Sequence, residues 1–164
     1  MTKQQFTSKG TSISVVNKIY TNKDFACGSN ILDYGGGKYD KNIEYMAHKG
    51  CKVVVYDPYN RSDEYNKATM SFVASNPIHY VVCSNVLNVI KEQTVLCEVL
   101  NNIATIQRKN KGCRVYIAVY EGNKTGVPAE TSKGWQRNLP TKGYLDIISK
   151  FMPISEVKNG IIVC

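Results

Sequence analysis

Two acidic residues and a glycine triplet are the side chains best suited to ligand chemistry in this sequence. Each acid stands at the end of an apolar, strand-like run, 30–34 or 52–56, and the glycines fall between the two runs. Glycine lets the backbone turn sharply, while a carboxylate accepts hydrogen bonds from hydroxyl or ammonium groups. The set comprises Asp33, Gly35, Gly36, Gly37, Asp57 and Pro58. A strand, a glycine turn, a helix and a second strand in this order indicate a βαβ unit that binds an adenosine-containing ligand.

The spacing of the glycines distinguishes between two kinds of adenosine ligand. A dinucleotide fingerprint needs glycine at its first, third and sixth positions, but the sixth residue counted from Gly35 is Asp40. A carboxylate there would compete with phosphates for the N–H groups at a helix N-terminus. NAD and FAD are therefore disfavoured, and a nucleotide-binding oxidoreductase remains only as a third interpretation.

The pattern instead resembles motif I of class I S-adenosylmethionine-dependent methyltransferases, in which an acid stands two residues before a glycine pair. Asp33, followed by Gly35 and Gly37, has this spacing. The resemblance implies that Asp57 holds the ribose hydroxyls and that Ser84 and Asn85 lie beside the methionine end of the cofactor. A bare strand-to-helix turn would explain the glycines alone, but with both acids present we favour the cofactor site.

The resemblance implies a single α/β domain, 1–164, with a three-layer Rossmann-like methyltransferase sheet, and hydrophobic periodicity locates its elements. Strands are expected at 30–34, 52–56, 80–83 and 113–120, with a long helix at 91–108 between the last two. Only 21 residues separate Asp57 from the strand-like run that begins at His79. The fold should therefore be abbreviated around strand 3, for which Met70–Ala74 is the candidate.

Both ends of the chain fit this architecture. A helix at 141–151 is followed by two short runs, 154–157 and 161–164, and Asn159-Gly160 between them predicts a hairpin. The resemblance implies that the last strand runs antiparallel to an otherwise parallel sheet. The first 29 residues contain one amphipathic helix, 12–20, which we interpret as a lid or entrance segment, or as a helix that covers one sheet face.

The catalytic group is harder to predict than the cofactor site. The motifs at 32–35, 57–58 and 85–90 are similar to those of small methyltransferase-like proteins from phages and DNA-modification loci. However, the Asp/Asn/Ser-Pro-Pro-aromatic tetrad of amino-methylating DNA enzymes is absent, and Cys83 is not preceded by proline as a cytosine-C5 nucleophile would be. Transfer to an N or O nucleophile by proximity remains. Asn85 and Glu121 are the candidate catalytic residues, although Asn85 could equally cap a helix or fix a turn.

A long polar loop, 121–140, holds the candidate substrate-binding residues. Stacking and hydrogen bonding to a base would suit Trp135, Gln136, Arg137 and Asn138, but Trp135 could equally anchor the loop. Region 105–142 carries eight basic and two acidic residues, and this gives +6 of the net charge of +8. Nucleic acid is therefore an expected partner of this region, with a solvated surface as the alternative.

Other features of the composition narrow the choice of function. Six cysteines without a C-x-x-C pair and only two histidines predict no metal site. We find no signal peptide and no membrane-spanning run, so a cytoplasmic location is expected, in the host cytoplasm if a phage encodes the protein. The predicted function is S-adenosylmethionine-dependent methyl transfer to a nucleic acid or a small molecule. The alternative is a non-catalytic S-adenosylmethionine-binding protein that acts as a sensor or sequesters the cofactor.

Overall fold

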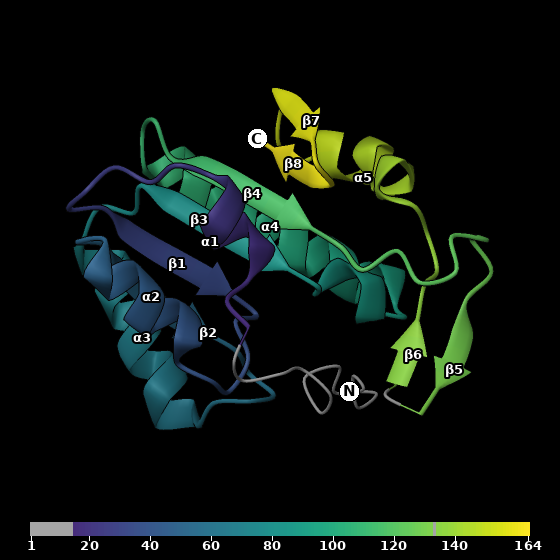
Figure 1. Cartoon of the computed structure of the whole chain (residues 1–164), viewed down its shortest axis with the longest axis horizontal. Helices are drawn as coiled ribbons and strands as arrows, with labels where there is room; N and C mark the ends of the chain where they lie inside the picture. Colours follow the sequence, from purple (N-terminus) through teal and green to yellow (C-terminus); the bar gives the residue numbers. More distant parts are fainter. Residues whose placement is uncertain (1–14, 133) are drawn as a thin grey trace.

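A computed structural model describes residues 15–132 and 134–164 of the chain as a six-stranded sheet with helices on both faces (Figure 1). The strands of this sheet are β1 (Asn30–Tyr34), β2 (Lys52–Tyr56), β3 (Tyr80–Ser84), β4 (Arg114–Ala118), β7 (Glu156–Lys158) and β8 (Ile161–Val163). The helices are α1 (Lys18–Asn22), α2 (Lys41–His48), α3 (Asp63–Ser75), α4 (Gln93–Lys109) and α5 (Leu145–Ser149), with short 3-10 turns η2 (Leu87–Val89) and η3 (Thr141–Tyr144).

The order of the strands determines where a ligand can bind. The sheet runs β2-β1-β3-β4-β8-β7, and β1 pairs in parallel with both β2 and β3. The chain therefore moves outward from β1 to β2 and then crosses to the other side of β1. Ligands of open α/β sheets bind at such a reversal, beyond the carboxyl ends of the strands. Antiparallel pairing of β8 with β4 confirms the predicted direction of the last strand.

The expected abbreviation around strand 3 is confirmed, but the short strand predicted at Met70–Ala74 is wrong. Those residues lie in the C-terminal half of α3. Ser62 caps this helix, since its side chain accepts a hydrogen bond from the Tyr65 N–H at 3.2 Å. The buried Thr69 hydroxyl donates to the Val55 carbonyl at 2.7 Å, which ties α3 to β2. The described chain thus keeps the helix α3 but forms no strand beyond β2, and β2 is an edge strand of the described sheet.

The C-terminal hairpin has the predicted turn. Asn159 and Gly160 both have positive φ, 54° and 71°, as the tight two-residue turn between antiparallel strands requires. The loop 121–140 differs from the prediction, because it contains the small hairpin of β5 (Ala129–Thr131) and β6 (Gly134–Gln136). Strands of three residues are too short to leave a recognisable alternation in the sequence.

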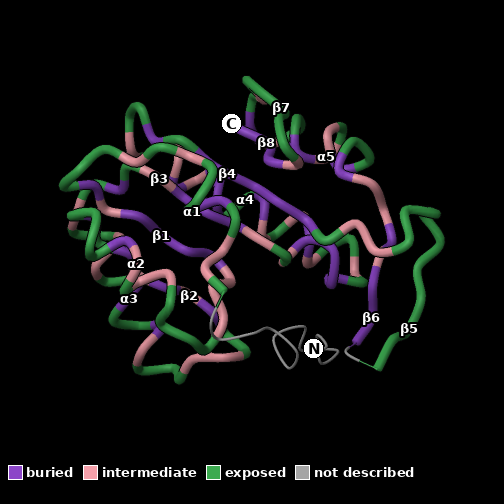
Figure 2. Tube along the Cα trace, in the orientation of Figure 1, coloured by how far each residue is buried: buried purple, intermediate pink, exposed green. Residues whose placement is uncertain are grey.

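Two hydrophobic clusters hold the layers together, one on each face of the sheet, and most of the strands are buried (Figure 2). One cluster packs α3, α4 and α5 on the sheet, with Leu100 and Ile103 of α4 completely buried. The other packs α1 and α2, through the fully buried Ile19, Tyr20 and Met46. Residues 12–14 of the predicted helix, and 1–14 of the predicted lid segment 1–29, lie outside the described residues. In the described part the helix begins only at Lys18, after the N-cap Asn17.

Candidate functional site

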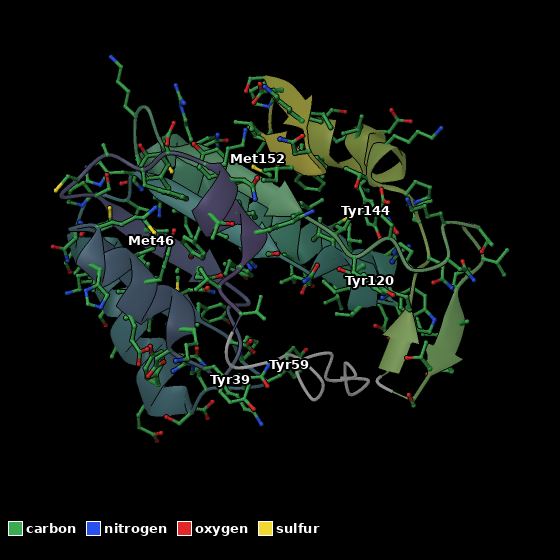
Figure 3. The ribbon with its side chains drawn as sticks, viewed as in Figure 1. Tyr39, Met46, Tyr59, Tyr120, Tyr144 and Met152 are labelled. Atoms are coloured by element: carbon green, nitrogen blue, oxygen red, sulfur yellow. The ribbon has the colours of Figure 1, made fainter. Side chains whose placement is uncertain are left out.

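A cleft of about 1350 Å³ opens at the carboxyl ends of β1, β2, β3 and β4. It is lined by all the residues that the sequence suggested for the cofactor: Asp33, Gly35, Gly36, Gly37, Asp57, Pro58, Ser84 and Asn85. Tyr39 and Tyr59 mark its side near β1 and β2, and Tyr120 extends from the end of β4 (Figure 3). Residues far apart in the sequence therefore meet at one edge of the sheet.

Asp33 lies at the bottom of the cleft and is almost completely buried. Its Oδ2 accepts hydrogen bonds from the Tyr20 hydroxyl at 2.9 Å and from Asn42 Nδ2 at 3.3 Å. Burial raises the pKa of this carboxyl to about 6, although both hydrogen bonds act in the opposite direction. A cationic group beside Asp33 would stabilise its ionised form, so the site suits a ligand that carries an ammonium.

The three glycines are needed for different physical reasons. Gly35 has φ +80°, and a Cβ there would overlap the Val86 side chain. A Cβ on Gly36 would lie 2.7 Å from Asp33 Cγ, which is closer than packed atoms approach. Gly37 has φ +77°, and a Cβ there would meet nothing within 4 Å, so this residue leaves open space on the cleft wall. The first two glycines allow close packing, and the third leaves room for a ligand.

Asp57 holds the glycine loop in place. Its Oδ2 accepts from the Gly37 N–H at 2.9 Å and from Asn60 Nδ2 at 3.0 Å. Its Oδ1 accepts from the N–H groups of Tyr59 and Asn60, both at 3.0 Å. Four donors from the chain thus orient one buried carboxylate at the cleft wall.

Arg61 also binds the glycine loop, through backbone carbonyls. Its role was not predicted from the sequence. Its Nε donates to the Gly37 carbonyl at 2.7 Å, and its Nη2 donates to the Tyr39 carbonyl at 3.1 Å. Its Nη1 pairs with Asp40 Oδ1 at 2.8 Å, while the arginine side chain is only 9% exposed. Asp40, whose position distinguished the loop from a dinucleotide fingerprint, is thus a partner of Arg61.

Asn85 begins the turn that leaves β3. Its φ of 59° is in the left-handed region, which asparagine tolerates better than most residues, and its N–H donates to the Ala118 carbonyl at 2.9 Å. Its exposed side chain lines the cleft beside Ser84. The N-cap of α4 is Glu92, so of the alternatives for Asn85 the turn fits the structure and the helix cap does not.

Glu121, the other candidate catalytic residue, does not line the cleft. Its Oε1 accepts from the Thr141 N–H at 2.8 Å, and its Oε2 pairs with Lys124 at 3.1 Å. These contacts, led by the Thr141 backbone hydrogen bond, lower the pKa of its carboxyl to about 2. A carboxylate that holds its proton so weakly is a poor general base at neutral pH, and both features argue against a catalytic role.

The four candidate substrate-binding residues of the long loop are divided by the structure. Trp135, Gln136 and Asn138 line the cleft, whereas Arg137 does not. Instead the Arg137 guanidinium donates to the Ile90 carbonyl and lies 5.1 Å from the centre of the Trp135 ring. Asn138 also supports the loop, because its side chain donates to the Val127 carbonyl at 2.9 Å.

The basic residues of region 105–142 do not gather at the cleft. Four of them, Arg108, Lys109, Lys111 and Arg114, surround the junction from the end of α4 to the start of β4. That junction is at the amino end of β4, whereas the cleft is at the carboxyl end. Lys124 and Lys142 border a separate shallow depression, and Lys133 lies outside the described residues.

Comparison with solved structures places this arrangement among known folds. The structure is similar to that of a TehB-like SAM-dependent methyltransferase from Corynebacterium glutamicum, with a TM-score of 0.50 and 16% sequence identity. The alignment covers 85% of this chain and 80% of that protein. The chain has a Rossmann-like methyltransferase fold. No protein-family profile matches the sequence, and no curated protein matches it either.

Neither a metal cluster nor a membrane span occurs among the described residues. They contain no group of three His, Cys, Asp or Glu side chains that could hold a metal ion. None of their helices has the length and apolar character needed to cross a membrane.

Proposed function

We propose that the protein binds S-adenosylmethionine in the cleft and transfers its methyl group to an N or O nucleophile. The observation that carries this proposal is the meeting of the glycine loop, Asp33 and Asp57 at the reversal of strand order between β1 and β3. A methyltransferase of known structure with the same fold supports it. When bound, S-adenosylmethionine supplies a methyl group activated by a sulfonium, and the transfer releases S-adenosylhomocysteine and a proton.

Different residues of the cleft would bind different parts of S-adenosylmethionine. Asp33 would hold the ammonium, because its buried carboxylate gains most from a cationic neighbour. Asp57 would accept from the ribose hydroxyls in place of Asn60 Nδ2, while it keeps the Gly37 N–H and so holds the loop. Ser84 and Asn85 would face the methionine end, and the open space at Gly37 would allow the ligand to lie against the backbone.

The reaction needs alignment more than a strong base. The catalytic contribution proposed for Asn85 is to accept a hydrogen bond from the nucleophile and orient it, and proximity of this kind provides much of a rate enhancement. The acceptor predicted from the sequence is a nucleic acid, bound through region 105–142, or a small molecule. The similarity to phage and DNA-modification proteins favours the first, and the distribution of cations described above favours the second.

Calorimetric titration tests the cofactor assignment. The protein should bind S-adenosylmethionine and S-adenosylhomocysteine, and Asp57→Ala should lose both, because it removes a hydroxyl acceptor and the anchor of Gly37. A thermal melt of the variant shows whether the domain still folds. Unchanged affinity in Asp57→Ala would overturn the assignment.

The alternative function is cofactor binding without transfer. It is favoured by one observation. Apart from Glu98 on α4, the described cleft residues from β3 to the long loop include no acid or histidine that could serve as a base. Release of S-adenosylhomocysteine from S-adenosylmethionine on a panel of nucleic acids and metabolites would exclude this alternative.

A further inference from the structure

Charged side chains are distributed unevenly along the cleft. The charged residues that line the cleft lie near the ends of β1 and β2 or on α4. They are Lys18, Asp33, Lys38, Lys41, Asp57 and Glu98. Glu98 belongs to this side because it stands one turn before Asn102 on α4, and Asn102 Nδ2 donates to the Tyr34 hydroxyl, at the end of β1, at 3.2 Å. We define the acceptor half as the residues within 84–89 and 119–138 that line the cleft. The described residues of the acceptor half include no charged side chain.

The acceptor half is built from amides and aromatic rings. Its amide side chains are Asn85, Asn88, Asn123, Gln136 and Asn138, and its rings are Tyr120 and Trp135. Tyr120 is 61% exposed, so its ring is available to a ligand in the cleft. Amides both donate and accept hydrogen bonds, and aromatic rings stack on other flat groups. These groups suit a flat, uncharged molecule with polar substituents.

Asn88 carries a polar atom without a partner in this half. The residue is only 1% exposed, and its Oδ1 has no hydrogen bond to any described residue. Its backbone is well fixed, because its carbonyl accepts from the Arg137 N–H at 2.9 Å. Buried polar atoms are nearly always paired, so an unpaired oxygen on the wall of a cleft indicates a missing donor. Arg137 Nε is likewise buried without a described partner, so the donor for Asn88 Oδ1 is either this Nε or an N–H or O–H group of a ligand.

Two described cations of the long loop, Arg137 and Lys124, do not line this half and contact other groups of the chain. Arg137 is held by the Ile90 carbonyl and lies against the Trp135 ring, and Lys124 pairs with Glu121. Binding of DNA or RNA depends mainly on cations that contact phosphates. The described wall of the acceptor half offers none, so a phosphate would lose its hydration there without a cation to balance its charge.

We infer that the methyl acceptor is a small, uncharged ring compound with an amide, amine or hydroxyl substituent, and not a nucleic acid. The inference rests on the proposed function, since it concerns the same cleft. It assigns the stacking surface mainly to the exposed Tyr120, with the largely buried Trp135 ring in the wall behind the ligand, and the hydrogen bonds to the surrounding amides.

The test uses three near-isosteric probes that differ in charge: benzamide, benzoate and benzamidine. Trp135 is the only tryptophan of the chain, so its fluorescence reports directly on the acceptor half. The intact protein is first saturated with S-adenosylhomocysteine, and its binding is measured separately by calorimetry. Benzamide should quench Trp135 with an affinity at least about tenfold higher than that of benzoate, and salt should have little effect.

Three results would overturn the inference while the proposed function stands. They are equal or tighter binding of benzoate, no response to any of the three probes, and a salt-sensitive response to a mixed-sequence oligonucleotide. Failure to bind S-adenosylhomocysteine would instead refute the proposed function. The two failures are therefore distinguishable.

Introducing a charge provides the matched control. Gln136→Glu is nearly isosteric and keeps the acceptor for the Arg137 N–H, so it should change the preference by about tenfold toward benzamidine. Asn123→Asp is a second variant at an exposed position, and a carboxylate there still accepts from Thr125. It should shift the preference in the same direction. If neither variant alters the order of the probes, the ring compounds bind elsewhere and the inference is wrong.

Discussion

Replacement of Arg61 by methionine tests how the glycine loop is held. The variant loses hydrogen bonds to the carbonyls of Gly37 and Tyr39, at 2.7 and 3.1 Å, and the ion pair with Asp40. A hydrogen bond from a charged donor contributes about 1.5 kcal/mol or more, so the two carbonyl contacts amount to about 3 kcal/mol. The Asp40 pair adds little, because the Asp40 side chain is 57% exposed and solvent screens it.

For a domain of this length, about 3 kcal/mol corresponds to a melting temperature about 6–12 °C lower. Differential scanning calorimetry with and without S-adenosylhomocysteine is the assay. Because the loop must be ordered before the ligand can bind, affinity should also fall by about tenfold or more. Asp40→Asn is the matched control and should change the melting temperature by about 2 °C at most. A melting temperature and an affinity close to those of the unmodified protein would show that Arg61 does not hold the loop.

Two further substitutions probe the floor of the cleft. Burial raises the pKa of Asp33 from 3.8 to about 6, so the folded state binds the proton more tightly, and stability present below about pH 4 is lost as the pH rises through 6. Asp33→Asn should remove this loss, about 3 kcal/mol, and weaken S-adenosylhomocysteine binding. The free energy of unfolding is measured in urea at several pH values. If it still falls between pH 4 and 6 in the variant, the prediction is wrong. Gly35→Ala should cost about 2–4 kcal/mol in urea unfolding through its φ of +80° and the overlap with Val86. Adding Val86→Ala should recover only the overlap, and full recovery would show that the φ angle is unimportant.

Much of the fold follows from local patterns in the sequence. The predicted bounds of β1 and β2 agree with the structure, because both are apolar runs enclosed by turn residues. Strands of a parallel sheet end at a common edge, so acids and glycines at those ends could be brought together without coordinates. Met70–Ala74 differs because Ser62-Asp63-Glu64 starts a helix that continues through Phe72 and Val73, although these two residues favour strands.

The supports of the site could not be predicted in the same way. Arg61 lies 24 residues from Gly37, and Tyr20 lies 13 residues from Asp33. Neither spacing corresponds to a helix face or a strand neighbour, so only the packing of α1 and the β2–α3 turn reveals these contacts. Asp33 and Asp57 were predictable because of where they stand on the strands, while Tyr20, Asn42 and Arg61 act through tertiary contacts.

The edge position of β2 has a consequence for self-association. An edge strand presents N–H and C=O groups that can pair with a strand of another molecule. Both faces of β2 are covered, by α2 and by α3, and Lys52 adds an exposed charge whose Nζ lies 4.2 Å from the Phe72 ring centre. A lysine at a sheet edge discourages strand addition. Loosening α3, for example by loss of the Ser62 cap, should therefore favour aggregation through β2 before the rest of the sheet opens.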